Sequence, residues 1–277
     1  MTLITILLCL ALQRFANLGR WFQPSWFSFY LKSLNPWLAK CNAWLALLLI
    51  MAPILILLAL LHVILAGKVF GLLDLLLATL VLFFCIDARD YNNQLTGYFT
   101  HLKKGDTQAA ANAMTAFIDT TAVSSTKPDL IRAVTKSILQ YSFTQLFAGL
   151  FWFMALGVYG VTIYFLITLL RSTPNTATKL AGQIQDILDW VPAKLLGISY
   201  ALAGNFGKGF SYWRKNLWTR LTETRKFAVA TGIAALDVVP DATKAVSQEN
   251  HAVLDLINHV LIIWLVVFTL VLLGIWL

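Results

Sequence analysis

Charge is scarce in this chain of 277 residues. Only 12% of the residues are charged, with 13 acidic against 21 basic side chains. A soluble domain carries about 25% charged residues. The 59% hydrophobic share and the 10 tryptophans exceed what a soluble core can bury. The composition therefore excludes an ordinary soluble fold and predicts a membrane protein.

Cysteine and catalytic motifs are also sparse. Cys9, Cys41 and Cys85 lie in or beside apolar sequence without CxxC spacing, so neither a disulfide framework nor a cysteine-based zinc site is predicted. The chain has no GxxxxGK[ST], HExxH or GxSxG motif, and its four histidines are scattered. The sequence therefore names no catalytic residue, no metal site and no cofactor.

Long apolar runs are what the chain does contain. They cover residues 43–66, 69–86, 146–170 and 260–277. Roughly 20 apolar residues of helix cross a bilayer core about 30 Å thick, so each run is a candidate transmembrane helix. The apolar residues 1–12 rise only about 18 Å as a helix, and no basic region precedes them. We expect them to be retained, and to lie against the membrane or pack on other helices.

These runs divide the chain into six predicted segments. They are an interfacial N-terminal segment, a transmembrane helical hairpin, a polar helical region, a transmembrane or re-entrant segment, an amphipathic helical region and a C-terminal transmembrane helix. Their boundaries are 1–41, 42–86, 87–141, 142–171, 172–259 and 260–277. No alternating strand pattern occurs. The predicted fold is all-α: a polytopic helical membrane protein with about four transmembrane or re-entrant helices and amphipathic polar helical regions.

The polar regions carry helix signals of their own. Asp106 predicts a new N-cap, and Pro128 predicts the first turn of a further helix. Residues 179–190 and 192–203 predict two helical pieces that meet at a proline. The basic and aromatic stretch 208–226 predicts a helix on anionic lipid headgroups. A nucleic-acid role for the net charge of +8 is rejected, because lipid explains such clusters beside membrane segments better.

His62 and Asp74 flank the short turn of the first hairpin. At 1.5 Å per residue they lie at similar depths of roughly 8 to 10 Å from the turn, so they can form an intramembrane pair. Ionisable groups inside a membrane are expensive and often functional. The alternative, which we favour, is that both lie near the interface and reach water.

The third run, 146–170, allows two topologies. If it crosses the bilayer, the basic residues divide almost evenly between the two sides. The alternative is a re-entrant hairpin broken at Gly157 and Gly160. In that case Lys68 is the one basic residue, out of 21, on the outer side of the membrane. This distribution fits the positive-inside rule better. Each leg would then reach only about 18 Å. We favour the re-entrant form, with a cytoplasmic N-terminus.

Three short segments together resemble a known family. The chain reads AGLFWF at 148–153, LDWVPAKL at 188–195 and SYALAGNF at 199–206. This combination resembles the AmpE family, inner-membrane proteins linked to β-lactamase induction in Gram-negative bacteria. That family is in turn similar to the adenosylcobinamide-phosphate synthases. The similarity is collinear from about residue 85 to 215, and the elements at 148–153 and 188–195 are moderately specific together.

The resemblance also marks departures from the synthases. Those enzymes carry acids at four positions that are here Lys136, Gln140, Thr144 and Arg171. Such acids suit a magnesium ion and a nucleotide phosphate. Their loss implies that this synthase site is missing. Of the remaining polar positions, Asp186 is retained, Asp189 replaces an asparagine and Lys194 replaces an arginine.

The resemblance implies a regulatory signalling protein, linked to β-lactamase induction or the cell-wall-stress response, that senses a small ligand without catalysis. It is expected to be a multi-pass protein of the bacterial inner (cytoplasmic) membrane. Expected partners are anionic lipid headgroups, a small-molecule ligand and a regulatory protein. The alternatives are a membrane-bound amide-forming synthase of the cobinamide-phosphate type and a transporter of a wall-derived solute. The expected ligand site consists of Asp87, Arg89, Asp186, Asp189, Lys194 and Asn205.

Overall fold

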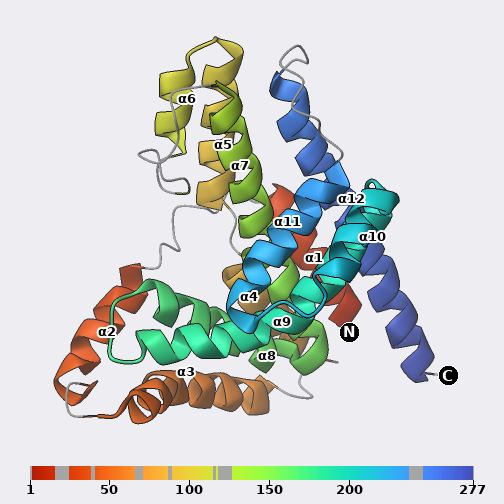
Figure 1. The fold of residues 1–277 in the computed structure, drawn as a ribbon. Coiled ribbons are helices and arrows are strands. Elements are labelled where there is room, and N and C mark those ends of the chain that lie inside the picture. The colour runs from red at the N-terminus through yellow and green to blue at the C-terminus, as the bar shows by residue number, and fades with distance from the viewer. Residues whose placement is uncertain are drawn as a thin grey trace. The chain divides into compact units, whose positions relative to one another are not determined.

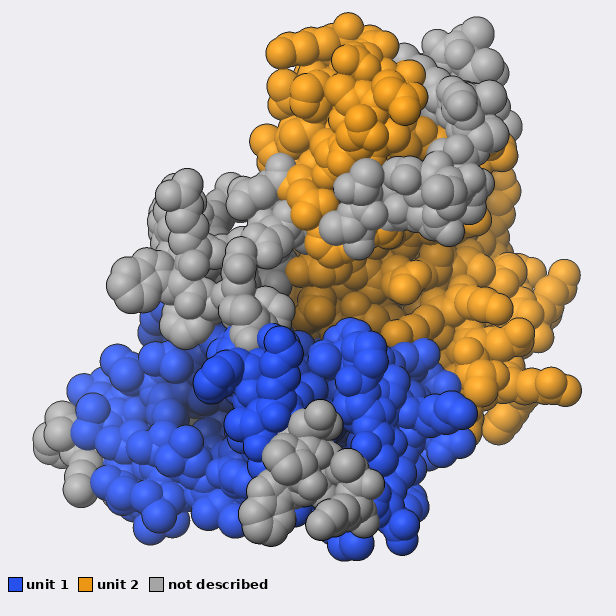
Figure 2. All heavy atoms as spheres, turned by 90° about the vertical axis from the view of Figure 1, so that its left-hand side faces the viewer, with its two compact units in different colours: residues 1–87, 148–189 blue, residues 88–147, 190–277 orange. Residues whose placement is uncertain are grey.

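Helices form every regular element in the part of the chain that the structure describes (Figure 1), which confirms the all-α prediction. The structure is a computed structural model, and it describes residues 2–15, 25–38, 41–65, 71–86, 89–114, 117, 127–236 and 246–276. The chain divides into two compact units (Figure 2). Unit 1 comprises residues 1–87 and 148–189, and unit 2 comprises residues 88–147 and 190–277.

Within the described ranges, three helical stretches are long and apolar enough to cross a membrane. They are residues 43–65, 129–172 and 252–274, and two shorter apolar helices cover residues 3–12 and 72–85. The chain is accordingly a multi-pass membrane protein, as the apolar runs predicted. The second predicted crossing is shorter than expected, because its described helix holds only 14 residues and rises about 21 Å.

Unit 1 is built mainly from the apolar helices. Its elements are α1 (Thr2–Phe15), α2 (Ser25–Leu38), α3 (Ala43–Leu65), α4 (Leu72–Cys85), α8 (Ala148–Ser172) and the first half of α9 (Thr178–Ala203). A core of buried side chains joins α2, α3, α8 and α9, with Phe27, Ile50, Leu170 and Ala181 at its centre. Helix α4 packs on α1, α3 and α8. The N-terminal apolar helix therefore packs on other helices, one of the two placements expected for it.

Helix α8 folds back on itself at Gly157. This residue has φ 65° and ψ −148°, a backbone region open almost only to glycine. A Cβ atom at Gly149 would lie 3.9 Å from a methyl group of Val161, although 12 residues of straight helix span about 18 Å. A Cβ atom at Gly160 would overlap the carbonyl oxygen of Trp152. The two legs of α8 therefore run side by side in opposite directions.

Gly157 and Gly160 are the two glycines at which the sequence predicted a break, and they act differently. Gly157 is the non-helical residue, whereas Gly160 lies in the second leg and permits the close approach of the first. The candidate span 129–172 is consequently bent rather than one straight helix. Its course relative to the bilayer stays a prediction.

Unit 2 contains the helices of the polar regions and the C-terminal apolar helix. Its elements are α5 (Arg89–Lys103), α6 (Thr107–Ala113), α7 (Lys127–Tyr141), the π-helix η2 (Ser142–Phe147), the second half of α9, α10 (Phe206–Lys215), the 3₁₀ turn η3 (Leu221–Glu223), α11 (Thr224–Leu236) and α12 (Val246–Trp276). The predicted cap is confirmed, because Asp106 accepts a hydrogen bond of 2.9 Å from the backbone N–H of Ala109. Helix α7 packs on α11 and α12.

Two helix predictions were wrong. Residues 178–203 form one helix through Pro192 rather than two pieces, because buried contacts at Ala193 and Leu196 outweigh the local effect of the proline. The stretch 208–226 is not one helix: α10 ends at Lys215, and a turn follows before α11 begins. The amide N–H of Asn216 closes α10 by donating to the Tyr212 carbonyl.

Candidate functional site

The residues expected to bind a ligand fall in different parts of the molecule. Asp87 lies outside the described residues, and Arg89 opens α5 with a side chain that is also outside the description. Asp186 and Asp189 belong to unit 1, whereas Lys194 and Asn205 belong to unit 2. The contacts of each residue within its own unit decide what it does.

Three pairs of polar side chains connect the second leg of α8 to α9 in unit 1. Tyr164 donates to an oxygen of Asp189 over 2.8 Å, Gln185 donates to the hydroxyl of Thr168 over 2.9 Å, and Arg171 donates to Asp186 over 2.7 Å. We call these six residues the polar ladder. Their spacing on α8 is four and three residues, which places them on one helical face.

The loop between the two helices supports this arrangement. Asn175 donates to the Leu170 and Thr173 carbonyls and accepts from the N–H of Ala177. Since only a short turn separates the helices, residues late in α8 meet residues early in α9. The ladder therefore follows from the turn together with the polar stripe on each helix.

The ladder is buried at one end and half-exposed at the other. Asp189 and Gln185 are fully buried, whereas the side chain of Arg171 is 35% exposed. The amide oxygen of Gln185 is buried with no hydrogen-bond partner among the described atoms. A buried acceptor without a donor costs about 1 to 3 kcal/mol. A ligand or water with an N–H or O–H group would complement it.

The ion pair between Arg171 and Asp186 changes the chemistry expected of Asp186. At 2.7 Å the guanidinium neutralises the carboxylate, and the same Nη1 also donates to the Gly182 carbonyl over 3.3 Å. Charge-assisted bonds of this length are among the stronger protein hydrogen bonds. Asp186 is therefore held in the helix pair by Arg171, just as Asp189 is held by Tyr164.

Lys194 sits in a niche of unit 2 built from uncharged groups. Its ammonium donates to the Thr219 hydroxyl over 2.9 Å and to the Asn216 carbonyl over 3.3 Å, and it lies 3.4 Å from the centre of the Phe227 ring. Burial lowers the pKa of Lys194 from 10.5 to about 8. The backbone carbonyl of the same residue accepts from the Trp213 indole, so Lys194 ties α9 to α10, to α11 and to the turn before α11.

Asn205 has a local structural role. Its side-chain oxygen accepts from the N–H of Lys208 over 3.1 Å, and its own N–H donates to the Ala235 carbonyl over 2.7 Å. The first contact is an N-cap. Asn205 thereby begins α10 and holds it against α11. The N-cap bond accounts for an asparagine at position 205 without a bound ligand.

The predicted pair of His62 and Asp74 has a third member. His62 Nε2 lies 3.6 Å from a carboxylate oxygen of Asp74, and its Nδ1 lies 3.2 Å from the Tyr159 hydroxyl. The rings of His62 and Tyr159 are nearly parallel, with centroids 5.7 Å apart. The imidazole therefore joins α3, α4 and the tip of the α8 hairpin. The side chains of His62 and Asp74 are 36% and 44% exposed.

Sequence reasoning missed Tyr164, Thr168 and Gln185 in the ladder and Tyr159 beside His62. A signal existed, because polar residues at 164, 168 and 171 form a helical stripe inside an otherwise apolar run. Their partners Asp186 and Asp189 on α9 were already among the expected site residues, and Gln185 lies on the same helical face as Asp189.

The structure shows where the four residues lie that replace acids of the synthases. Lys136 and Gln140 are exposed on α7, and the Thr144 hydroxyl donates to the Gln140 carbonyl over 3.1 Å. Arg171 is committed to Asp186. The described residues contain no cluster of three or more His, Cys, Asp or Glu side chains that could hold a metal ion.

Comparisons with known proteins find three similar relatives. The chain is similar to the cobalamin biosynthesis protein CobD of Chromobacterium violaceum (26% identity, 60% of this chain and 56% of the relative) and of Stutzerimonas stutzeri (32%, 44% and 42%). It is also similar to Protein AmpE of Shigella flexneri (25%, 61% and 63%). The matches thus span between 42% and 63% of these relatives. No solved structure matches the chain.

A family profile covers far more of the chain than these pairwise matches do. The profile described as "Regulatory signalling modulator protein AmpE" matches residues 1–276. The chain therefore belongs to the AmpE family.

Proposed function

We propose that this protein is a regulatory signalling component of a bacterial cytoplasmic membrane that links a cell-wall-stress or β-lactam signal to β-lactamase induction. The observation that carries the proposal is the family match over residues 1–276. The apolar spans support a site of action in the membrane. A regulatory protein partner would receive the signal.

The signal enters as a small ligand bound by the polar ladder of unit 1. The buried amide oxygen of Gln185 is an acceptor with no partner among the described residues, so the ligand carries an N–H or O–H donor. Asp189, which accepts from Tyr164, lies one helical turn from Gln185 on the same face of α9. Asp186 orients the site through its ion pair with Arg171. Lys194 and Asn205 support the fold of unit 2 in this proposal and do not contact the ligand.

The proposed role is non-catalytic. The synthases that the chain resembles carry acids at the positions of Lys136, Gln140 and Thr144, where they suit a magnesium-dependent phosphate or amine reaction, and none of the three residues here is acidic. The arginine at position 171 also offsets the charge of a neighbouring acid. These substitutions favour binding over chemistry.

A complementation experiment tests the regulatory role and the ligand site together. A strain lacking the gene receives the wild type, Gln185→Met or the exposed control Gln140→Met, each checked for equal amounts in the membrane. We expect the deletion to change β-lactamase activity under an inducing β-lactam, and Gln140→Met to restore the wild-type response.

The outcomes separate the two parts of the proposal. An unchanged response in the deletion strain would contradict the regulatory role. A full response from Gln185→Met would contradict the ladder as the ligand site while leaving the regulatory role intact. If Gln185→Met is absent from the membrane, Asp189→Asn serves as the second site variant.

A membrane-bound amide-forming synthase is the second candidate, favoured by the two matches to cobalamin biosynthesis proteins. Its test is complementation of a strain that lacks the synthase and is grown under conditions that require cobalamin synthesis. Growth would overturn the non-catalytic proposal. Failure by a protein present at normal levels would support it.

A further inference from the structure

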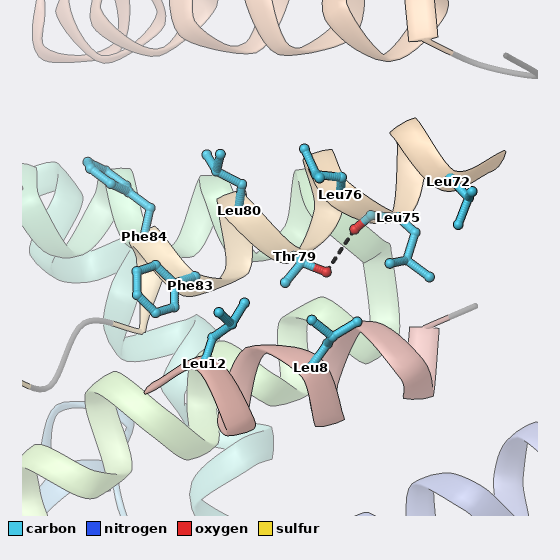
Figure 3. A pocket seen from close by; sticks show the side chains of 9 residues that line it. All are labelled: Leu8, Leu12, Leu72, Leu75, Leu76, Thr79, Leu80, Phe83 and Phe84. Carbon is cyan, nitrogen blue, oxygen red and sulfur yellow. Dashed lines mark hydrogen bonds between the residues drawn. The ribbon is translucent and has the colours of Figure 1, made fainter. Parts of the chain in front are cut away.

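An open apolar groove runs along α4 in unit 1, with α1 forming one wall (Figure 3). Its volume is about 470 Å³. Seven residues of α4 and two of α1 line it. On α4, Leu72, Leu76 and Leu80 recur every four residues, while Leu8 and Leu12 reach from α1 toward α4 (Figure 3). All five leucines are exposed to the surroundings of the protein.

The groove offers nothing to a polar ligand. Thr79 supplies the one polar side chain in the lining, and its hydroxyl already donates to the Leu75 carbonyl over 2.8 Å. The helix satisfies its own backbone groups. An occupant of this groove gains only the burial of hydrocarbon.

One end of the groove is held in place by aromatic packing. Phe84 meets Phe165 edge to face, with ring centroids 5.5 Å apart, and lies 6.0 Å from the Trp26 ring. These contacts fix Phe84 from two other helices of unit 1. The groove therefore has a fixed end wall and an open side.

The size of the groove selects among apolar occupants. A methylene group takes about the 30 Å³ share of a water molecule, so 470 Å³ holds about 15 of them. From Leu72 to Phe84 the groove is about 18 Å long, close to the roughly 15 Å thickness of one hydrocarbon leaflet.

We propose that the groove between α1 and α4 binds one acyl chain of a membrane phospholipid. The chain lies along the leucine stripe of α4 and ends against Phe84. Each buried methylene contributes to affinity, and the short helix α4 extends over only part of the bilayer thickness. This site is separate from the polar ladder, and it does not depend on the regulatory role proposed above.

Photolabelling of the full-length protein tests the site. The purified protein is reconstituted into phosphatidylcholine vesicles that contain a small fraction of a phosphatidylcholine with a diazirine on one acyl chain. After illumination, adducts are mapped by mass spectrometry. We expect labelling of α1 and α4 to exceed labelling of the lipid-facing leucines of α3 and to saturate as the labelled fraction rises.

Groove-filling variants supply the matched comparison. Leu76→Trp and Leu80→Trp should lower labelling of α1 and α4 by roughly fourfold for each methylene that no longer fits. Leu48→Trp on α3 replaces a leucine of similar exposure outside the groove and should leave the labelling unchanged. Circular dichroism and gel filtration in detergent establish that each variant is folded. One folded groove variant, Leu76→Trp or Leu80→Trp, is enough for the comparison.

Three results would overturn the proposal. The first is that α1 and α4 are labelled no more strongly than α3. Another is labelling that a folded groove variant leaves unchanged. The third is a cross-link between two copies of the chain at Leu76 or Leu80, which would assign the groove to a protein interface.

Discussion

At the scale of single residues, the polar side chains singled out by the sequence serve the packing of helices. Asp186 is paired with Arg171, Asp189 accepts from Tyr164, and Asn205 caps α10. An ion pair explains Asp186 and a helix cap explains Asn205, in each case without a ligand. Gln185, which the sequence did not single out, differs from them, because its buried amide oxygen has no partner in the described part of the chain.

The buried lysine gives a pH-dependent stability. In the unfolded chain the pKa of Lys194 returns to about 10.5, whereas burial lowers it to about 8 in the folded protein. Between these values the unfolded state holds the extra proton, so the free energy of unfolding rises with pH. We expect the thermal midpoint of the wild type to increase from pH 8 to pH 10 relative to that of Lys194→Met.

The shift in the pKa of Lys194 limits this gain in the free energy of unfolding to about 3 kcal/mol. Lys208→Met replaces an exposed lysine on α10 and should keep the wild-type trend. A parallel trend in wild type and Lys194→Met would contradict the assignment of the shifted pKa to Lys194.

The hydroxyl group of Tyr164 should contribute more to the stability of the protein than that of Tyr159. Tyr164 is 3% exposed and donates to the fully buried Asp189, so Tyr164→Phe should lower stability by about 1 to 3 kcal/mol. Tyr159 is half-buried beside His62, and Tyr159→Phe should cost less. Thermal unfolding in detergent measures both, and equal losses would contradict the buried position of Tyr164.

At the scale of elements, the turn inside α8 decides the shape of the third apolar run. Periodicity identifies helix on both sides of Gly157, because the legs have normal helical composition. Periodicity does not predict contact between the legs. That contact depends on the two backbone dihedral angles of Gly157 and on the absence of a side chain at Gly160.

A disulfide test distinguishes the bent α8 from a straight one. In a background without Cys9, Cys41 and Cys85, the pair Gly149→Cys and Val161→Cys should oxidise readily, because a side chain at 149 contacts Val161. The control pair Val158→Cys and Leu170→Cys has the same separation within one leg, about 18 Å, and should stay reduced. Mass spectrometry of the oxidised peptides gives the result, and the opposite pattern would refute the hairpin.

Two glycines of similar surroundings should respond in opposite directions to alanine. Open space surrounds the Cβ position of both Gly157 and Gly182. Gly157→Ala should destabilise by about 1 to 3 kcal/mol because of its backbone conformation. Gly182→Ala, inside α9, should stabilise by up to about 1 kcal/mol. Thermal midpoints compare them, and a neutral Gly157→Ala would mean that the turn is not fixed at this residue.

At the scale of the whole molecule, the folding-back of residues 146–170 determines sidedness. If this segment re-enters, residues on both sides of it face the cytoplasm. We expect single cysteines at Pro174 and Thr222, both exposed, to be unreactive toward an impermeant maleimide in intact cells and reactive after permeabilisation. Labelling of either position from outside would reject the re-entrant topology, and a cysteine variant known to face outward serves as the positive control.

The sequence by itself determined membrane residence, the all-α class, the cap at Asp106 and membership in a family, because composition, short spacings and motifs are local properties. The sequence also favoured a break of the third run at Gly157 and Gly160. Only the tertiary structure decided that the two legs of α8 pack against each other, that Tyr164 meets Asp189, and that Lys194 lies against Phe227. Each of these depends on contacts between residues far apart in the chain or on one backbone conformation. A polar stripe such as that at 164, 168 and 171 marks a helical face in the sequence but does not identify its partners.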